Sequence, residues 1–299
     1  MTCRQLYLEA RRRLSQAGID SPGVDAALLS QRFLGLDRPG LALHGEEEPA
    51  PEQAAAFLQA VEERAARRPL QYILGEWEFL GLPLAVGEGV LCPREDTAVL
   101  VESLAQGLQG RPAPRGLDLC AGTGAVALGL LTFLPGAVVQ CVELSDKAFP
   151  YLEENLRRHG RGQVTARKGD VLSPALAGEF APGSLDFVAS NPPYIETGEL
   201  ATLQPEVRRE PALALDGGGD GLVLPGHRPA VGAPGKARGP GGRGDWRNPR
   251  PGRGGTFSTA WPGGCGNPAG LGRAGPGRPR QTAVTSRAVS WIAGAFSPA

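Results

Sequence analysis

Strand-like and helical segments alternate along the middle of this chain, and this alternation limits the possible folds more than any other feature. The expected strands are residues 116–120, 138–143, 164–168 and 185–190, and the expected helices cover residues 97–108 and begin at Ala125 and Lys147. Such alternation is typical of βαβ units. The sequence therefore predicts an α/β domain with a doubly wound parallel sheet.

The chain before this domain has a different pattern, that of short amphipathic helices. Leu6 and Leu14 recur at helical spacing, and Ser21 supplies an N-cap before Pro22 at the first helical position. These helices either recognise a substrate or only pack together. The predicted boundaries are 1–70 for a small helical domain, 71–93 for a β-hairpin linker broken by glycine and proline, 94–221 for the α/β domain, and 222–299 for a tail.

Charge is divided unevenly along the chain. Residues 1–221 hold 20 basic and 30 acidic residues, a balance of about −10, whereas residues 222–299 hold 11 basic residues and one acidic residue. An acidic body is a poor match for nucleic acid, whose phosphates are neutralised by Lys and Arg. We therefore expect no direct nucleic-acid partner.

Several classes of protein are disfavoured by what the sequence lacks. No apolar run approaches the roughly 20 residues that span a bilayer, and the first residues do not resemble a secretory signal. The five cysteines are scattered without a Cys-x-x-Cys pair, which argues against a metal site or a disulfide framework. We expect a cytoplasmic monomer that binds neither membrane nor metal.

A glycine-rich turn follows the first expected strand, in the run from Asp118 to Gly124. Gly122 and Gly124 let the backbone approach a ligand, and the helix that follows offers free N–H groups. Glu143 ends the next strand, where its carboxylate can accept hydrogen bonds from both hydroxyls of a ribose. Asp118, with no phosphate-binding lysine nearby, suits a cationic nucleoside such as S-adenosylmethionine. The alternative is a plain turn between a strand and a helix.

The third expected strand ends in Asp170 and Val171. A carboxylate at this edge can reach an adenine amino group, and Val171 can pack on the adenine ring. Asp170 is equally consistent with an ordinary turn residue.

The run from Asn191 to Tyr194, Asn-Pro-Pro-Tyr, follows the last expected strand. Its prolines fix the backbone and remove two N–H donors, which leaves carbonyl oxygens as acceptors. The Asn191 side-chain oxygen and the Pro192 carbonyl can both accept from one planar –NH2 group, while Tyr194 covers its face. The alternative is a rigid surface turn.

Asn-Pro-Pro-Tyr is similar to the signature of methyltransferases that act on planar amino or amide nitrogens. Three further blocks resemble those of the release factor glutamine methyltransferase family, namely residues 69–75, 92–97 and 210–215. The resemblance covers nearly all of residues 1–221. It implies a Rossmann-like class I methyltransferase domain of the seven-stranded type, here without its last strands.

The resemblance also implies site residues and partners. Methyl transfer from S-adenosylmethionine to the glutamine amide of a Gly-Gly-Gln motif in peptide chain release factors is expected, with the N-terminal helices helping to hold the release factor. The implied cofactor-binding residues are Asp118, Cys120, Ala121, Gly122, Thr123, Gly124, Glu143, Asp170, Val171 and Asn191. The implied glutamine-binding residues are Asn191, Pro192, Pro193 and Tyr194, of which Asn191, Pro192 and Tyr194 are expected to be catalytic.

Three other functions remain open at this point. They are a glutamine methyltransferase for a ribosomal protein, a methyltransferase for adenine or guanine amino groups in nucleic acid, and an inactive truncated binding module. The block at residues 94–98 reads Arg-Glu-Asp-Thr-Ala where the family usually has Arg-Pro-Asp-Thr-Glu. The loss of that acidic side chain is expected to weaken cofactor affinity.

The tail beyond Gly221 does not continue the pattern. It is rich in Gly, Pro and Arg and lacks sustained periodicity, which is typical of disorder and of loose RNA binding. We favour a shift of the reading frame shortly after Gly221. Residues 242–249 permit codons that, read one base forward, encode the strand-like run Ala-Val-Glu-Ile-Gly-Ala-Thr. The nucleotide sequence tests this hypothesis, because the frame one base forward either encodes this run or does not.

Overall fold

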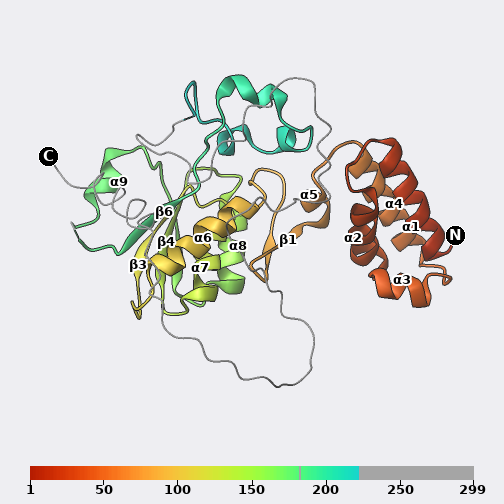
Figure 1. Ribbon diagram of the computed structural model, residues 1–299, viewed down its shortest axis with the longest axis horizontal. Coiled ribbons are helices and arrows are strands. Elements are labelled where there is room, and N and C mark those ends of the chain that lie inside the picture. The colour runs from red at the N-terminus through yellow and green to blue at the C-terminus, as the bar shows by residue number, and fades with distance from the viewer. Residues whose placement is uncertain (182, 222–299) are drawn as a thin grey trace, which may run out of the picture. The chain divides into compact units, whose positions relative to one another are not determined.

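A computed structural model of the chain describes residues 1–181 and 183–221. The first elements are four helices that pack together: α1 (Cys3–Gln16), α2 (Pro22–Leu34), α3 (Arg38–His44) and α4 (Pro51–Ala65) (Figure 1). Leu6, Leu14, Leu29, Phe57 and Val61 are buried between them. The predicted helical N-terminal domain is therefore confirmed. The predicted tail, residues 222–299, lies outside the described residues.

A short helix and a hairpin follow. Helix α5 (Leu70–Leu74) ends at Gly75, whose φ of 76° is left-handed. The hairpin pairs β1 (Glu76–Phe79) with antiparallel β2 (Leu82–Ala85). Its turn residues, Leu80 and Gly81, both have positive φ, which matches the right-handed twist of the two strands. The predicted hairpin thus begins at Glu76, because the first part of the expected linker is helical.

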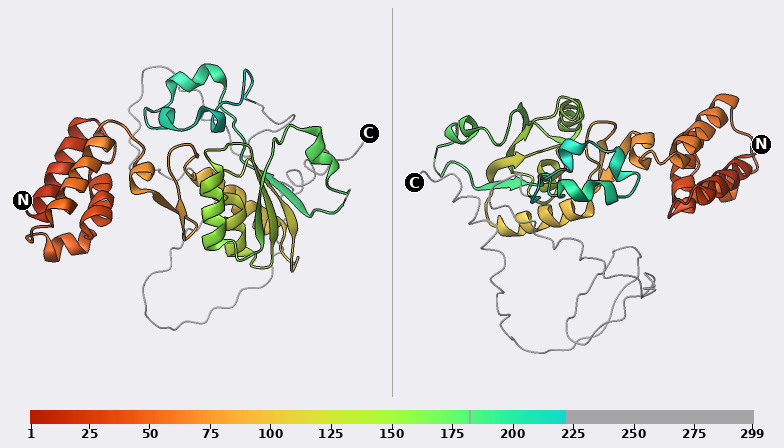
Figure 2. Two further views of the ribbon diagram at one scale, coloured as in Figure 1. Left: turned by 180° about the vertical axis from the view of Figure 1, so that it is seen from behind. Right: turned by 90° about the horizontal axis from the view of Figure 1, so that it is seen from above.

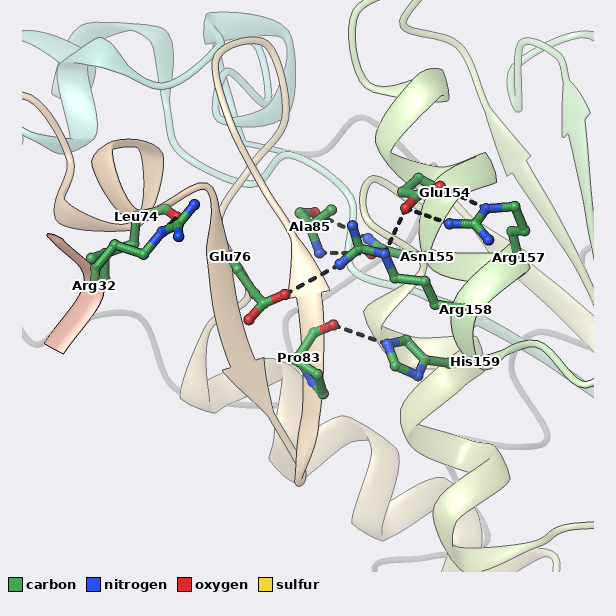
Figure 3. A network of polar contacts seen from close by, with 10 residues as sticks. All are labelled: Arg32, Leu74, Glu76, Pro83, Ala85, Glu154, Asn155, Arg157, Arg158 and His159. Atoms are coloured by element: carbon green, nitrogen blue, oxygen red, sulfur yellow. Dashed lines mark hydrogen bonds and ion pairs between the residues drawn. The ribbon is translucent and has the colours of Figure 1, made fainter. Parts of the chain in front are cut away.

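The hairpin is held by polar contacts from α8 (Phe149–His159) (Figure 3). The Asn155 side chain is fully buried; its Oδ1 accepts the Ala85 N–H at 2.7 Å and its Nδ2 donates to the Ala85 carbonyl at 3.1 Å. Arg158 of the same helix forms an ion pair of 3.2 Å with Glu76. The open end of the hairpin, where Glu76 pairs with Ala85, is thereby fixed to the α/β domain.

Four parallel strands form the described sheet, in the order β5-β4-β3-β6. Their bounds are β3 (Arg115–Leu119), β4 (Val138–Glu143), β5 (Val164–Lys168) and β6 (Phe187–Ser190). The direction of winding reverses at β3, because β4 and β5 lie on one side of it and β6 on the other. Ligands of open α/β sheets bind beside such a reversal, at the carboxyl ends of the strands.

Helices cover both faces of the sheet (Figure 2). On one face lie α6 (Glu95–Gly107), α7 (Ala125–Phe133) and α8, which pack on Val139, Cys141 and Phe187. On the other face, α9 (Pro174–Gly178) places Leu176 against Leu117, Leu119 and Val142. The predicted doubly wound α/β class is confirmed. Among the described helices, none is long and apolar enough to cross a membrane.

Between β6 and Gly221, the described chain forms three 3₁₀ helices: η1 (Thr197–Thr202), η2 (Val207–Arg209) and η3 (Ala212–Ala214). Glu206, just before η2, forms an ion pair of 2.9 Å with Arg64 of α4. Arg64 is 8% exposed and also pairs with Asp25 of α2 at 2.7 Å. A buried guanidinium with two carboxylate partners thus joins the helical domain to the segment that follows β6.

Candidate active site

A pocket lies at the carboxyl ends of all four parallel strands. Its lining includes residues that end or follow β3, β4, β5 and β6. Among the predicted site residues, the lining ones are Cys120, Ala121, Gly122, Thr123, Glu143, Asp170, Val171, Asn191 and Pro193. The structure therefore brings together in one pocket side chains that the sequence places on four separate turns.

The glycine-rich turn forms one wall of this pocket. Gly122 and Gly124 have φ values of 54° and 79°, a region that glycine adopts at no steric cost. A Cβ built on Gly122 would meet only Val90, at 3.9 Å, so this residue faces open space. Gly124 is the N-cap of α7 but does not line the pocket, because a Cβ at this position would meet Leu152 of α8 at 2.9 Å.

Cys120 has a left-handed backbone although it is not a glycine. Its φ is 57°, a conformation that costs a residue with a Cβ about 1 kcal/mol or more. Burial raises the pKa of its thiol to about 12, so the side chain is a neutral part of the wall.

Glu143 connects the turn to the end of β4. Its Oε2 accepts the Gly122 N–H at 2.8 Å and its Oε1 accepts the Ser145 N–H at 2.7 Å. These two bonds fix the plane of the carboxylate, and each oxygen keeps a second lone pair. The carboxylate is thus held in one orientation at the pocket, ready to accept from hydroxyl donors.

Asp118 lies outside the pocket lining, under the first turn of α7. Its Oδ2 accepts the Ala127 N–H at 3.2 Å and lies 3.9 Å from the Cys141 Sγ, whereas Oδ1 has no partner among the described residues. Burial raises the pKa of this carboxyl to about 8. Asp118 supports the turn from behind, because strand alternation directs its side chain to the face that α6, α7 and α8 cover.

Asp170 and Val171 follow β5 and both line the pocket. The Asp170 Oδ1 accepts the Leu172 N–H at 2.9 Å. Asp170 is therefore also a turn residue, which is the alternative that the sequence left open. Val171 packs on its other side against the cluster around Leu117. The two interpretations of Asp170 are compatible, because one carboxylate oxygen serves the turn and the other is not needed for it.

Asn191 begins the Asn-Pro-Pro-Tyr run directly after β6. The preceding Ser190 donates its hydroxyl to the Leu119 carbonyl at 2.9 Å, which fixes the end of β6 to β3. The Asn191 Nδ2 donates to the Thr97 Oγ1 at 3.0 Å. Within the described residues, neither the Asn191 Oδ1 nor the Pro192 carbonyl accepts a hydrogen bond. Both predicted acceptors are therefore without a donor among the described residues, and of the two residues only Asn191 lines the pocket.

The other members of this run are placed differently. Pro193 lines the pocket, whereas Pro192 is buried and does not. Tyr194 is 38% exposed and is also not among the lining residues. Partial burial, with Asp96 nearby, raises the pKa of Tyr194, so its hydroxyl stays protonated.

The charge of the pocket selects the kind of ligand it can hold. Its charged lining residues are Glu143, Asp170 and Asp216, and no lysine or arginine is among the described residues that line it. An acidic pocket attracts a cation and repels phosphate groups. Together with the open carboxylate of Glu143, this donor set fits a cationic nucleoside such as S-adenosylmethionine.

Comparisons with known proteins agree with this chemistry. A family model described as the PrmC N-terminal domain matches residues 5–75, and one described as the methyltransferase small domain matches residues 93–223. A release factor glutamine methyltransferase of Moorella thermoacetica is 43% identical over 232 residues, which cover 76% of this chain and 80% of that protein. The chain belongs to the release factor glutamine methyltransferase family.

Two further relatives in this family carry the same name. The protein of Deinococcus radiodurans is 40% identical, with 81% of this chain and 84% of the relative covered. The protein of Geobacter sulfurreducens is 42% identical, with 74% and 75% covered. The family resemblance predicted from the sequence is confirmed. The match to the methyltransferase small domain ends at residue 223, where the composition of the chain also changes.

Three residues of this family member have roles at the site that sequence reasoning did not assign. Thr97 bonds to Asn191, and Asn155 donates to the Thr123 carbonyl at 3.0 Å. Glu210 is 6% exposed; its Oε2 accepts the Cys92 N–H at 3.0 Å, and its other oxygen pairs with Arg94. Thr97 and Glu210 lie in blocks that the sequence singled out. For Asn155, the available signal was a polar residue on the apolar face of a helix.

Proposed function

We propose that this chain transfers a methyl group from S-adenosylmethionine to the side-chain amide nitrogen of the glutamine in the Gly-Gly-Gln motif of peptide chain release factors. The observation that carries the proposal is Asn191 at the end of β6, which faces the acidic pocket with its amide oxygen open. The names of the relatives support the choice of substrate.

The chemistry of an amide explains why such a site is needed. An amide nitrogen is a poor nucleophile, because its lone pair is delocalised into the carbonyl group. In the proposed complex, the Asn191 Oδ1 and the Pro192 carbonyl accept the two N–H bonds of the glutamine, and Tyr194 covers the face of the amide. Two acceptors fix the orientation of the nitrogen, and orientation can lower a barrier by several kcal/mol without a strong base.

The pocket has the groups that the cofactor needs. The Glu143 carboxylate would accept the ribose hydroxyls, Asp170 and Val171 would contact the adenine, and the turn at residues 120–124 would hold the methionine part. When bound, the cofactor supplies an activated methyl group on a cationic sulfur. The acidic lining favours that positive charge.

Four further expectations belong to this proposal. The N-terminal helices hold the release factor, and the enzyme acts as a monomer. Nucleic acid is not a substrate, which is supported by the balance of about −10 over residues 1–221. The cytoplasm is the site of action, which is supported by the free thiols of Cys3, Cys92, Cys120 and Cys141.

Methyl transfer from radiolabelled S-adenosylmethionine tests the function directly. The full chain is incubated with a release factor, with a variant of that factor in which the motif glutamine is alanine, with ribosomal proteins and with RNA. Label in the intact release factor alone supports the proposal. Label in RNA, in a ribosomal protein or in the alanine variant would contradict it.

The assigned role of Asn191 has its own test. Asn191→Ala removes the acceptor without filling the cofactor part of the pocket. We expect transfer to fall by at least about 100-fold, while the affinity for S-adenosylhomocysteine falls by less than about tenfold, because Glu143 and the other residues expected to bind the cofactor remain. Transfer at the wild-type rate would refute the role.

A further inference from the structure

The hydrogen bond between Thr97 and Asn191 joins two elements of the pocket that are far apart in the sequence. Thr97 lies in the first turn of α6 and is 5% exposed, and Asn191 directly follows β6. The Thr97 Oγ1 accepts from the Asn191 Nδ2 at 3.0 Å. Both residues line the pocket. The bond therefore lies beside the place where the amide of a substrate would bind.

A primary amide has one accepting end and one donating end of nearly equal size. If the Asn191 side chain turned by 180°, its –NH2 group would face the –NH2 group of the substrate. Two donors would then oppose each other, and a buried donor without an acceptor costs about 1–3 kcal/mol. Transfer therefore needs the amide orientation seen in the structure, in which Nδ2 is directed to Thr97. In the described structure, Thr97 is the residue that bonds to its donating end.

Thr97 is itself held in place by its neighbours. Its N–H donates to the Arg94 carbonyl at 3.1 Å. The Arg94 side chain pairs with Glu210, and Glu210 also accepts the Cys92 N–H at 3.0 Å. These contacts fix residues 92–97 against Glu210. They thereby also fix the position of Thr97.

We propose that Thr97 is a positioning residue, which fixes the side chain of Asn191 by accepting from its Nδ2, so that the amide oxygen lies where the –NH2 group of the substrate would bind. The inference rests on the proposed function, because it assigns the Asn191 oxygen to the glutamine amide. It gives the block at residues 92–97 a role in the transfer step in addition to its role in packing.

Thr97→Val tests the inference, because valine has the shape of threonine without the hydroxyl. We expect kcat to fall by about 10- to 100-fold, as is typical when a reacting group loses its orientation. The affinity for S-adenosylhomocysteine should stay near that of the wild type, and the melting temperature should fall by no more than about 5 °C, because Asn191 lines the pocket and its freed –NH2 group can be hydrated there. Thr97→Ser keeps the hydroxyl and should restore kcat to within about threefold. Thr165→Val, on the exposed side of β5, is the matched control.

Two results would overturn the inference. One is a kcat of Thr97→Val within twofold of the wild type. The other is a parallel loss of kcat, melting temperature and cofactor affinity in both Thr97→Val and Thr97→Ser, which would make Thr97 a residue of the fold only.

The failure of the proposed function is a separate outcome. It is seen when the wild-type chain transfers no methyl group to the release factor. The side-chain amide of Asn191 in 15N-labelled protein then still reports on Thr97. Its proton exchange should be at least about threefold faster in Thr97→Val, because the bond at 3.0 Å is lost. Unchanged exchange would overturn the inference independently of activity.

Discussion

The Asn155 amide donates a hydrogen bond of 3.0 Å to the backbone carbonyl of Thr123, so that α8 holds the glycine-rich turn. The same –NH2 group donates to Ala85, and the oxygen of this side chain accepts from Ala85. One fully buried amide thus connects the hairpin, α8 and the glycine-rich turn that lines the pocket.

Removal of this amide should destabilise the fold. Asn155→Leu would leave buried N–H and C=O groups of Ala85 and Thr123 without partners, each at a cost of about 1–3 kcal/mol. Because three such groups lose their partner, we expect the free energy of unfolding to fall by about 3–5 kcal/mol in urea titrations. His159→Ala on the same helix removes only a 2.9 Å contact with the Pro83 carbonyl and should cost less than about 1 kcal/mol. Equal stability of the two variants would show that the amide does not join these elements.

Glu143→Gln should weaken cofactor binding more than it weakens the fold. Glutamine keeps one acceptor oxygen but places an –NH2 group against the N–H of Gly122 or Ser145, and it removes the negative charge. A hydrogen bond to a charged group is worth about 1.5–3 kcal/mol, so calorimetry should show an affinity for S-adenosylhomocysteine about 10- to 100-fold lower. Asp146→Asn, at a side chain that is 95% exposed, should leave the affinity unchanged. An equal loss in both variants would mean that overall charge, and not Glu143, determines binding.

Cys120→Gly should be more stable than Cys120→Ala. Both variants remove the thiol, but only glycine adopts a φ of 57° without a penalty from Cβ. The expected difference in the free energy of unfolding is about 1 kcal/mol in favour of glycine. Thermal or urea unfolding of the two proteins measures it, and a more stable alanine variant would contradict the strain assigned to this turn.

Asp118 should make the stability of the protein depend on pH. Burial raises the pKa of this carboxyl to about 8, above its value in the unfolded chain, so the folded state binds the proton more tightly. The stabilising contribution is complete at pH values below the unfolded pKa and is lost as the pH rises toward 8. Between pH 5 and pH 8 the melting temperature of the wild type should fall more than that of Asp118→Asn. Parallel melting curves would show that Asp118 is not protonated in the fold.

Much of the architecture could be predicted from local patterns. The strands β4 and β5 have the bounds that their apolar runs predicted, and Asn191 directly follows a strand as expected. These features depend on neighbouring residues, which the sequence displays directly. The helix α5 differs from the expected hairpin because Pro69 and Gly75 bound a single helical turn, which is too short to show periodicity.

The remaining features depend on pairings between distant segments. Thr97 and Asn191 are 94 residues apart, and Asn155 and Thr123 are 32 apart. No spacing rule connects such positions, because the sheet decides which turns meet at its edge. Asp118 shows the same limit: its place before the glycines suggested a cofactor contact, whereas the direction of its side chain in β3 puts it beneath α7.

The lining residues that follow Glu210 determine when, during synthesis of the chain, the pocket can be completed. Pro211, Leu213, Ala214 and Asp216 line the pocket, and Glu210 fixes the chain at Cys92, which is 118 residues earlier. During synthesis, the glycine-rich turn and Glu143 leave the ribosome well before these residues. A nascent chain that stops short of Glu210 therefore holds an open half-site, and the described pocket can be complete only after Asp216 has emerged.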